Sequence, residues 1–141
     1  MSNAATETLS VVLERDIPFP PEKIWRALTQ PHLIEEWLMK NDFKPVAGHR
    51  FNLRKDPQPD VSVIVDCQVL AIEPNKRLSY TWAAYGLESV VTWTLTPTSK
   101  GSHLRMEQSG FRPDQQQAYR GARVGWHGFL TSLELVLARV D

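Results

Sequence analysis

Hydrophobic positions along the chain recur with two different periods, and each period predicts one kind of element. Near the start, Ile24, Trp25 and Leu28 form a stripe at helical spacing, directly after Pro21, a residue that suits the first turn of a helix. Pro31 interrupts this pattern, and a second short apolar stripe follows it. After residue 40 apolar residues alternate with polar ones, which is typical of strands with one buried face.

The alternating segments predict a sheet with helices on one side. The predicted strands cover residues 9–17, 48–55, 61–74, 77–83, 87–97 and 102–110, with a turn at 56–60. After Pro113 a long helix is predicted to run to about residue 140. Short turns imply antiparallel neighbours, and only the helices are available to cover the apolar face. The fold class is therefore α+β: a curved antiparallel sheet of about six strands wrapped around the long C-terminal helix, with two short helices after the first strand.

The length of 141 residues fits one domain, which we place at residues 8–141. A chain of this size buries enough surface to fold without a disulfide or a structural metal. Residues 1–7 are polar, and we expect them to form a loose terminus outside the fold.

Charge and cysteine content exclude several classes of protein. Sixteen basic and sixteen acidic residues cancel, so the composition shows no footprint for nucleic acid or an anionic membrane surface. No apolar run approaches the roughly 20 residues of a membrane span. The single cysteine, Cys67, rules out an intrachain disulfide, and the N-terminus lacks the pattern of a secretion signal. We therefore expect a cytoplasmic protein.

Four segments in this order resemble the START-like, helix-grip superfamily, and within it the branch named for the activator of heat shock protein 90 ATPase. They are PPEKIWRALTQPHLIEEWLM, AIEPNKRLSYTW, VVTWTLTPTSKGSHLRMEQSGF and GWHGFLTSLELVL, and the resemblance covers residues 9–140. It implies a cavity between the sheet and the long helix, where many members bind small apolar or amphipathic molecules and some act as cyclases or other enzymes. One position departs from the branch, which often has His where this chain has Gln108. An amide cannot titrate, so proton transfer there is in doubt.

Inward-facing aromatic residues are the main candidates for a binding site. Trp82, Trp93 and Trp126 each fit an ordinary core, but as a set they suit a mostly apolar ligand pocket. Gln108 is a polar residue on an apolar strand face, so it is either a ligand contact or an amide that caps nearby backbone. The predicted ligand-binding residues are Phe51, Leu53, Trp82, Val91, Trp93, Met106, Gln108, Trp126, Phe129 and Leu133. His49 and Arg50 are predicted at the rim, with Arg50 as the cation for a ligand carboxylate.

Three glycines in the last helix need an explanation, since each costs about 1 kcal/mol relative to alanine in a helix interior. Gly121, Gly125 and Gly128 lie near the stripe of Trp126 and Phe129. We favour the hypothesis that they let the helix approach a strand or a ligand closely. The alternative is that they face solvent and only weaken the helix.

Other chemistry finds little support in the residues. His32, His49, His103 and His127 are scattered, without metal-like spacing to Cys67 or to one another. Neither a nucleophile elbow nor a phosphate or dinucleotide loop occurs, and Cys67 fits a small buried apolar residue. We therefore predict no metal, no cofactor and no catalytic residue.

Three functions remain open. The first is non-catalytic binding of a small hydrophobic or amphipathic molecule, including lipids, in the cavity. The second, which the branch name implies, is an interaction domain linked to a chaperone, although nothing here supplies the additional N-terminal domain of the full co-activator. The third is a cyclase- or hydrolase-like enzyme, which needs an acid or base within the cavity. The exposed strand face also allows a homodimer.

Overall fold

The computed structural model describes residues 8–58 and 61–140. Residues 1–7, expected to form a loose terminus, and residues 59–60 of the expected turn lie outside the described residues. The elements are β1 (Leu9–Ile17), α1 (Pro21–Thr29), α2 (Pro31–Trp37), β2 (Lys40–Asn41), β3 (Arg50–Gln58), β4 (Val61–Glu73), β5 (Arg77–Ala84), β6 (Leu87–Thr98), β7 (Gly101–Phe111) and α3 (Gln116–Arg139).

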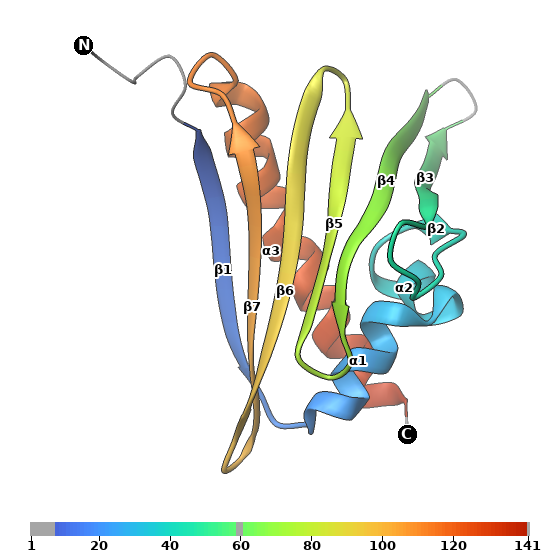
Figure 1. Cartoon of the computed structure of the whole chain (residues 1–141), viewed down its shortest axis with the longest axis vertical. Helices are drawn as coiled ribbons and strands as arrows, with labels where there is room; N and C mark the ends of the chain where they lie inside the picture. The colour runs from blue at the N-terminus through green and yellow to red at the C-terminus, as the bar shows by residue number, and fades with distance from the viewer. Residues whose placement is uncertain (1–7, 59–60, 141) are drawn as a thin grey trace.

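The strands form one antiparallel sheet in the order β1-β7-β6-β5-β4-β3-β2. Hairpin connections explain the order from β3 to β7, and β1 closes the sheet beside the last strand (Figure 1). The predicted α+β class is confirmed, with α1, α2 and α3 all following the predicted order.

Two strands differ from the prediction by more than one residue at an end. A seventh strand, β2, pairs with Leu53 and Arg54 of β3, but it is only two residues long and too short for alternation to reveal. Strand β3 begins at Arg50, two residues later than expected, and continues to Gln58 inside the segment predicted as a turn. Asp56 and Pro57 disfavour strands in general, so turn composition misled the prediction there.

Alternation along the strands matches burial. In β4, Val65, Cys67 and Val69 are buried, whereas Asp66 is exposed. Strands β6 and β7 repeat the pattern, with Trp93 and Met106 almost completely buried. The sheet therefore has one apolar face, and α3 crosses that face diagonally (Figure 1).

The two halves of α3 differ in the size of their side chains. Residues 126–137 bury one large stripe: Trp126, Leu130, Leu133, Val136 and Leu137. Before Trp126 the residues at the same helical spacing are small: Ala118, Gly121, Ala122 and Gly125. The C-terminal half therefore packs closely in the core, and the N-terminal half lacks the volume to do so.

The two short helices complete the core under the C-terminal half of α3. The Trp37 indole nitrogen donates a hydrogen bond to the Ala27 carbonyl at 2.8 Å, which joins α2 to α1. Its ring meets Trp93 edge-on, with 5.6 Å between ring centroids. Arg139 also pairs with Glu36 at 2.8 Å, which fixes the end of α3 to α2.

The turn between β6 and β7 depends on glycine. Gly101 links β6 to β7 with φ of 150°, and a Cβ there would overlap the Ile17 carbonyl oxygen. Next to it, the Ser102 hydroxyl donates to the Phe19 carbonyl at 2.7 Å. This turn therefore packs directly against the segment that joins β1 to α1.

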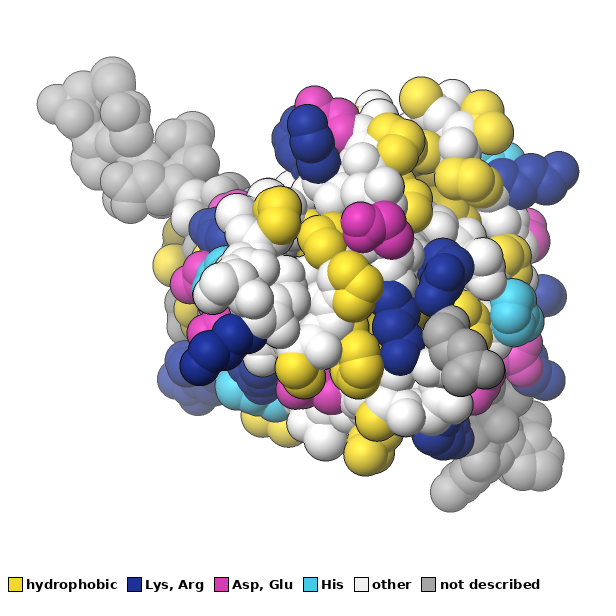
Figure 2. Space-filling view, turned by 90° about the horizontal axis from the view of Figure 1, so that it is seen from below, with side chains coloured by type: hydrophobic (Ala, Val, Ile, Leu, Met, Phe, Trp, Pro, Cys, Tyr) yellow, Lys and Arg dark blue, Asp and Glu magenta, His cyan; other side chains and the backbone are white. Residues whose placement is uncertain are grey.

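The surface is mixed in charge where Figure 2 shows it. On this face, seen from below, basic and acidic side chains are interspersed and hydrophobic side chains reach the surface between them. None of the helices in the described part of the chain is long and apolar enough to span a membrane.

Candidate functional site

A cavity of about 370 Å³ lies between the N-terminal half of α3 and strands β4 to β7. Its volume is at the lower end of the roughly 300–1,000 Å³ typical of small-molecule sites. The lining residues are Met39, Val63, Val65, Trp82, Ala84, Tyr85, Leu87, Gln108, Gln115, Ala118, Gly121, Ala122, Gly125, Trp126 and Phe129. The cavity exists because α3 presents small side chains here, opposite large ones from the sheet.

The cavity has a deep end and a mouth. Gln108 and Trp126 are buried at its deep end, with 1% and 2% of their surfaces exposed. Tyr85, in the turn between β5 and β6, is 79% exposed and marks the mouth. Gln115 is near the same turn, where its side-chain nitrogen donates to the Gly86 carbonyl at 3.4 Å.

Gln108 is held in one orientation. The Trp126 indole N–H is a donor only, so the amide oxygen of Gln108 must face it, at 2.7 Å. The amide nitrogen then donates to the Ser89 hydroxyl at 2.9 Å, and that hydroxyl donates to the Trp82 carbonyl at 2.8 Å. Of the two alternatives for Gln108, backbone capping is not what the structure shows, since both partners of the amide are side chains.

Aromatic rings form the wall around this amide. Trp126 contacts Trp82 and Phe129, with ring centroids 5.2 Å and 5.4 Å away, and Trp93 lies behind it at 5.6 Å. The indoles of Trp82 and Trp93 thus both pack against Trp126, and the cavity lies on the side of Trp82 and Trp126.

The predicted binding residues separate into two groups. Trp82, Gln108, Trp126 and Phe129 line the cavity. The remaining six are buried in the core and lie outside the lining: Phe51, Leu53, Val91, Trp93, Met106 and Leu133. Strand alternation identifies the inward face, but it does not show where along that face the helix leaves room.

The two predicted rim residues lie away from the cavity. His49 directly precedes β3 and Arg50 begins it, and both are absent from the lining. The His49 side chain is hydrogen-bonded to the Asp42 carbonyl, with 3.0 Å between Nε2 and the oxygen, and its ring stacks on Phe51. The predicted pairing of Arg50 with a ligand carboxylate stays a prediction.

The hypothesis that the α3 glycines let the helix approach a strand closely is wrong. A Cβ added at Gly121, Gly125 or Gly128 would meet no atom within 4 Å. Gly121 and Gly125 nevertheless line the cavity, which leaves approach to a ligand as their predicted role.

Most of the missed lining residues come from α3 and the β5–β6 turn. Ala118, Gly121, Ala122 and Gly125 share one helical face, and this spacing of small residues was the available signal. Tyr85 lies in the β5–β6 turn and Leu87 begins β6 directly after it. The position of this end of the hairpin relative to α3 depends on the curvature of the sheet, which the sequence does not show.

Titratable groups are scarce in the lining. Among the described residues that line the cavity, Tyr85 is the one titratable side chain. Cys67 and Tyr80 lie behind the wall, and burial raises the pKa of the Cys67 thiol to about 12, with a further contribution from Asp66. Burial also raises the pKa of Tyr80. The arrangement is suited to holding an apolar molecule rather than to transferring protons.

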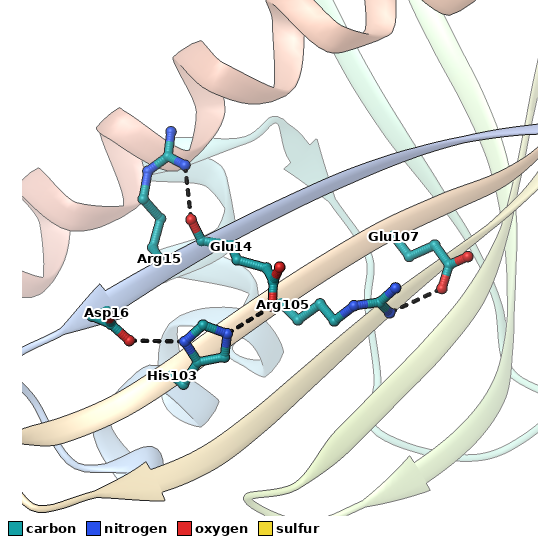
Figure 3. A network of polar contacts seen from close by, with 6 residues as sticks. All are labelled: Glu14, Arg15, Asp16, His103, Arg105 and Glu107. Atoms are coloured by element: carbon teal, nitrogen blue, oxygen red, sulfur yellow. Dashed lines mark hydrogen bonds and ion pairs between the residues drawn. The ribbon is translucent and has the colours of Figure 1, made fainter.

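A polar cluster on the opposite face of the sheet surrounds His103. Figure 3 shows His103 between Asp16, whose carboxylate is 2.8 Å from Nδ1, and Glu14, whose carboxylate is 2.8 Å from Nε2. These hydrogen bonds raise the pKa of His103. Arg105 pairs with Glu107 alongside, at 3.0 Å. The described residues include no cluster of three or more His, Cys, Asp or Glu side chains suited to a metal ion.

Comparison with known families identifies the domain. Residues 18–138 match the model of the family described as activator of Hsp90 ATPase homolog 1-like protein. The chain belongs to this family. The match covers α1, α2, all of α3 except its last residue and every strand except β1, and it includes every residue of the cavity lining.

Solved structures of bacterial proteins share the fold of this chain. Protein MLL2253 from Mesorhizobium loti is 62% identical, with a TM-score of 0.88 over 94% of this chain and 99% of that one. A protein from Rhodobacter sphaeroides is 22% identical, with a TM-score of 0.83 over 96% and 100% of the two chains. BH1534 from Bacillus halodurans is 25% identical, with a TM-score of 0.76 over 92% and 96%. No curated protein gives a significant match.

Proposed function

We propose that this domain binds a small, largely apolar molecule in the cavity between α3 and the sheet. The observation that carries the proposal is the apolar cavity itself, with one oriented amide at its deep end. Small-molecule sites have this composition: a mostly hydrophobic lining with a few fixed polar groups.

The cavity supports modest affinity. Burial of about 300 Å² of ligand surface contributes roughly 7 kcal/mol at ~25 cal/mol per Å². Association costs reduce this value, so dissociation constants in the micromolar to millimolar range are expected.

The test is binding of the neutral fluorescent probe N-phenylnaphthylamine, followed by its emission and by isothermal titration calorimetry. Wild-type protein is expected to bind the probe, and Gly125→Leu is expected to reduce binding at least tenfold because a leucine there fills the cavity. Gly128→Leu is the matched control, because Gly128 is on the same helix but outside this lining. Absence of binding to the wild type, or equal loss in both variants, contradicts the proposal.

A chaperone-linked role is the second candidate, and the family's description is the observation that favours it. Co-purification of the bacterial Hsp90 homologue with immobilised wild-type protein tests it, with the Arg139→Glu and Glu36→Arg single variants as controls for surface charge. Failure to retain the chaperone, measured together with its ATPase rate, contradicts this second role and leaves cavity binding unaffected.

A further inference from the structure

The deep end of the cavity holds one hydrogen-bond donor that the protein does not use. Trp126 and Ser89 engage the amide oxygen of Gln108 and one of its two N–H groups. The second N–H has no acceptor among the described residues. Since Gln108 is 1% exposed and lines the cavity, a molecule inside the cavity is the available partner for that N–H.

The two side chains that hold Gln108 are themselves occupied. The Trp126 indole N–H is directed to Gln108, and the Ser89 hydroxyl donates to the Trp82 carbonyl. The donor orientation is therefore fixed before a ligand enters, which reduces the ordering cost of binding.

The lining is also uncharged. None of the described residues that line the cavity carries a formal charge at neutral pH. An ionised carboxylate brought to the deep end would lose its hydration without gaining a cation, which is costly. A neutral oxygen acceptor requires only one donor, and Gln108 supplies it.

We infer that the cavity selects uncharged apolar molecules that carry a hydrogen-bond acceptor, such as a ketone or aldehyde oxygen, at the end that enters first. Gln108 is the residue that donates a hydrogen bond to this oxygen. The inference rests on the proposed function and narrows the class of ligand. It excludes ionised fatty acids, and it predicts that a plain hydrocarbon binds more weakly than a ketone of the same shape.

Three probes of nearly equal shape test the inference by calorimetry: acetylnaphthalene, isopropenylnaphthalene and naphthoate. The ketone is expected to bind roughly two- to tenfold more tightly than the hydrocarbon, the difference that one net hydrogen bond produces. Naphthoate is expected to bind more weakly than both. Equal binding of ketone and hydrocarbon overturns the inference while the proposed function stands, and absence of binding by all three overturns both.

Gln108→Glu is the matched variant. A glutamate keeps an oxygen for the Trp126 indole and, when protonated, a donor for Ser89, but no second donor remains for the ligand. The ketone and the hydrocarbon are expected to bind this variant equally, and a retained ketone preference overturns the role of Gln108.

A second readout uses only the wild type and does not depend on the variant folding. The side-chain amide protons of Gln108 are expected to shift in the NMR spectrum with acetylnaphthalene and to stay in place with isopropenylnaphthalene. Equal shifts with both probes contradict the hydrogen bond.

Discussion

Gln108 shows how one buried side chain combines a structural and a binding role. Its amide oxygen satisfies the Trp126 indole, one N–H satisfies Ser89, and the other N–H points to no described protein acceptor. Buried polar groups generally need hydrogen-bond partners, so burial of the Gln108 amide depends on Trp126 and Ser89.

The Gln108–Trp126 hydrogen bond is expected to show coupling in a double-mutant cycle. Gln108→Leu leaves the indole N–H unpaired, and Trp126→Phe leaves the amide oxygen unpaired, each at a cost of about 1–3 kcal/mol. The double variant removes both the donor and the acceptor, so neither is left buried without its partner. Its loss of unfolding free energy, measured in urea, should therefore be smaller than the sum of the losses in the two single variants. Strict additivity would show that the pair contributes no specific energy.

His103 gives the stability of the protein a pH dependence. Its two carboxylate partners, Asp16 and Glu14, raise its pKa in the folded state, so the folded protein favours the protonated ring. This stabilisation is fully present below the unfolded value of 6.5 and is lost as pH rises through the folded pKa. Arg105, on the same strand, is paired with Glu107.

The measurement is the urea midpoint of wild type and His103→Gln between about pH 5 and pH 8, the range in which histidine titrates. The urea midpoint of the wild type should exceed that of the variant at low pH, and the difference should shrink towards pH 8. NMR titration of the ring should give a pKa above 6.5, which falls when Glu14→Gln and Asp16→Asn are combined. A pH-independent difference between wild type and His103→Gln contradicts the prediction.

At the scale of elements, the sequence predicts most of the structure but only part of the cavity. Period-two alternation and turn residues located every long strand, because burial of one face requires that pattern. Strand β2 was missed since two residues carry no period. Five of the six core residues predicted as ligand contacts, Leu53 and Met106 among them, lie on strands and share the inward face of the sheet with Trp82, and the sixth, Leu133, lies on α3. The diagonal course of α3 decides which inward-facing residues line the cavity and which are packed in the core. This course arises from tertiary packing.

Glycines in α3 and in the β6–β7 turn are expected to respond oppositely to alanine. Gly121→Ala and Gly128→Ala should each stabilise the protein by up to about 1 kcal/mol, because helix propensity rises and the new Cβ meets open space. Gly101→Ala should destabilise it by more than about 1 kcal/mol, because its φ of 150° and the nearby Ile17 carbonyl exclude a side chain. Thermal and urea unfolding measure both. A loss of stability in Gly121→Ala would show that the helix does not tolerate the added methyl group.

For the whole molecule, the uneven packing of α3 divides the domain into a tightly packed part and a hollow part. The C-terminal half of α3 joins the core with α1, α2 and the centre of the sheet, whereas the N-terminal half covers the cavity. Stability against local opening follows buried apolar contact, so the two parts should differ. A homodimer through the outer sheet face stays a prediction.

Hydrogen exchange is expected to reveal this division. Amides of residues 120–125 should exchange faster than those of residues 130–137, although all belong to one helix. Saturation with acetylnaphthalene should slow exchange mainly in the first segment, because a ligand that binds only the folded state protects what it contacts. Uniform protection along α3, with or without the probe, contradicts the division.

The single cysteine makes the opening of the sheet directly measurable. Cys67 is buried in β4, two residues from Val65 of the cavity wall, and its raised pKa keeps the thiol protonated at neutral pH. A disulfide reagent therefore reacts only with molecules in which β4 has separated from its neighbours. The rate of labelling therefore reports the fraction of opened molecules, and the natural cysteine makes an engineered reporter unnecessary.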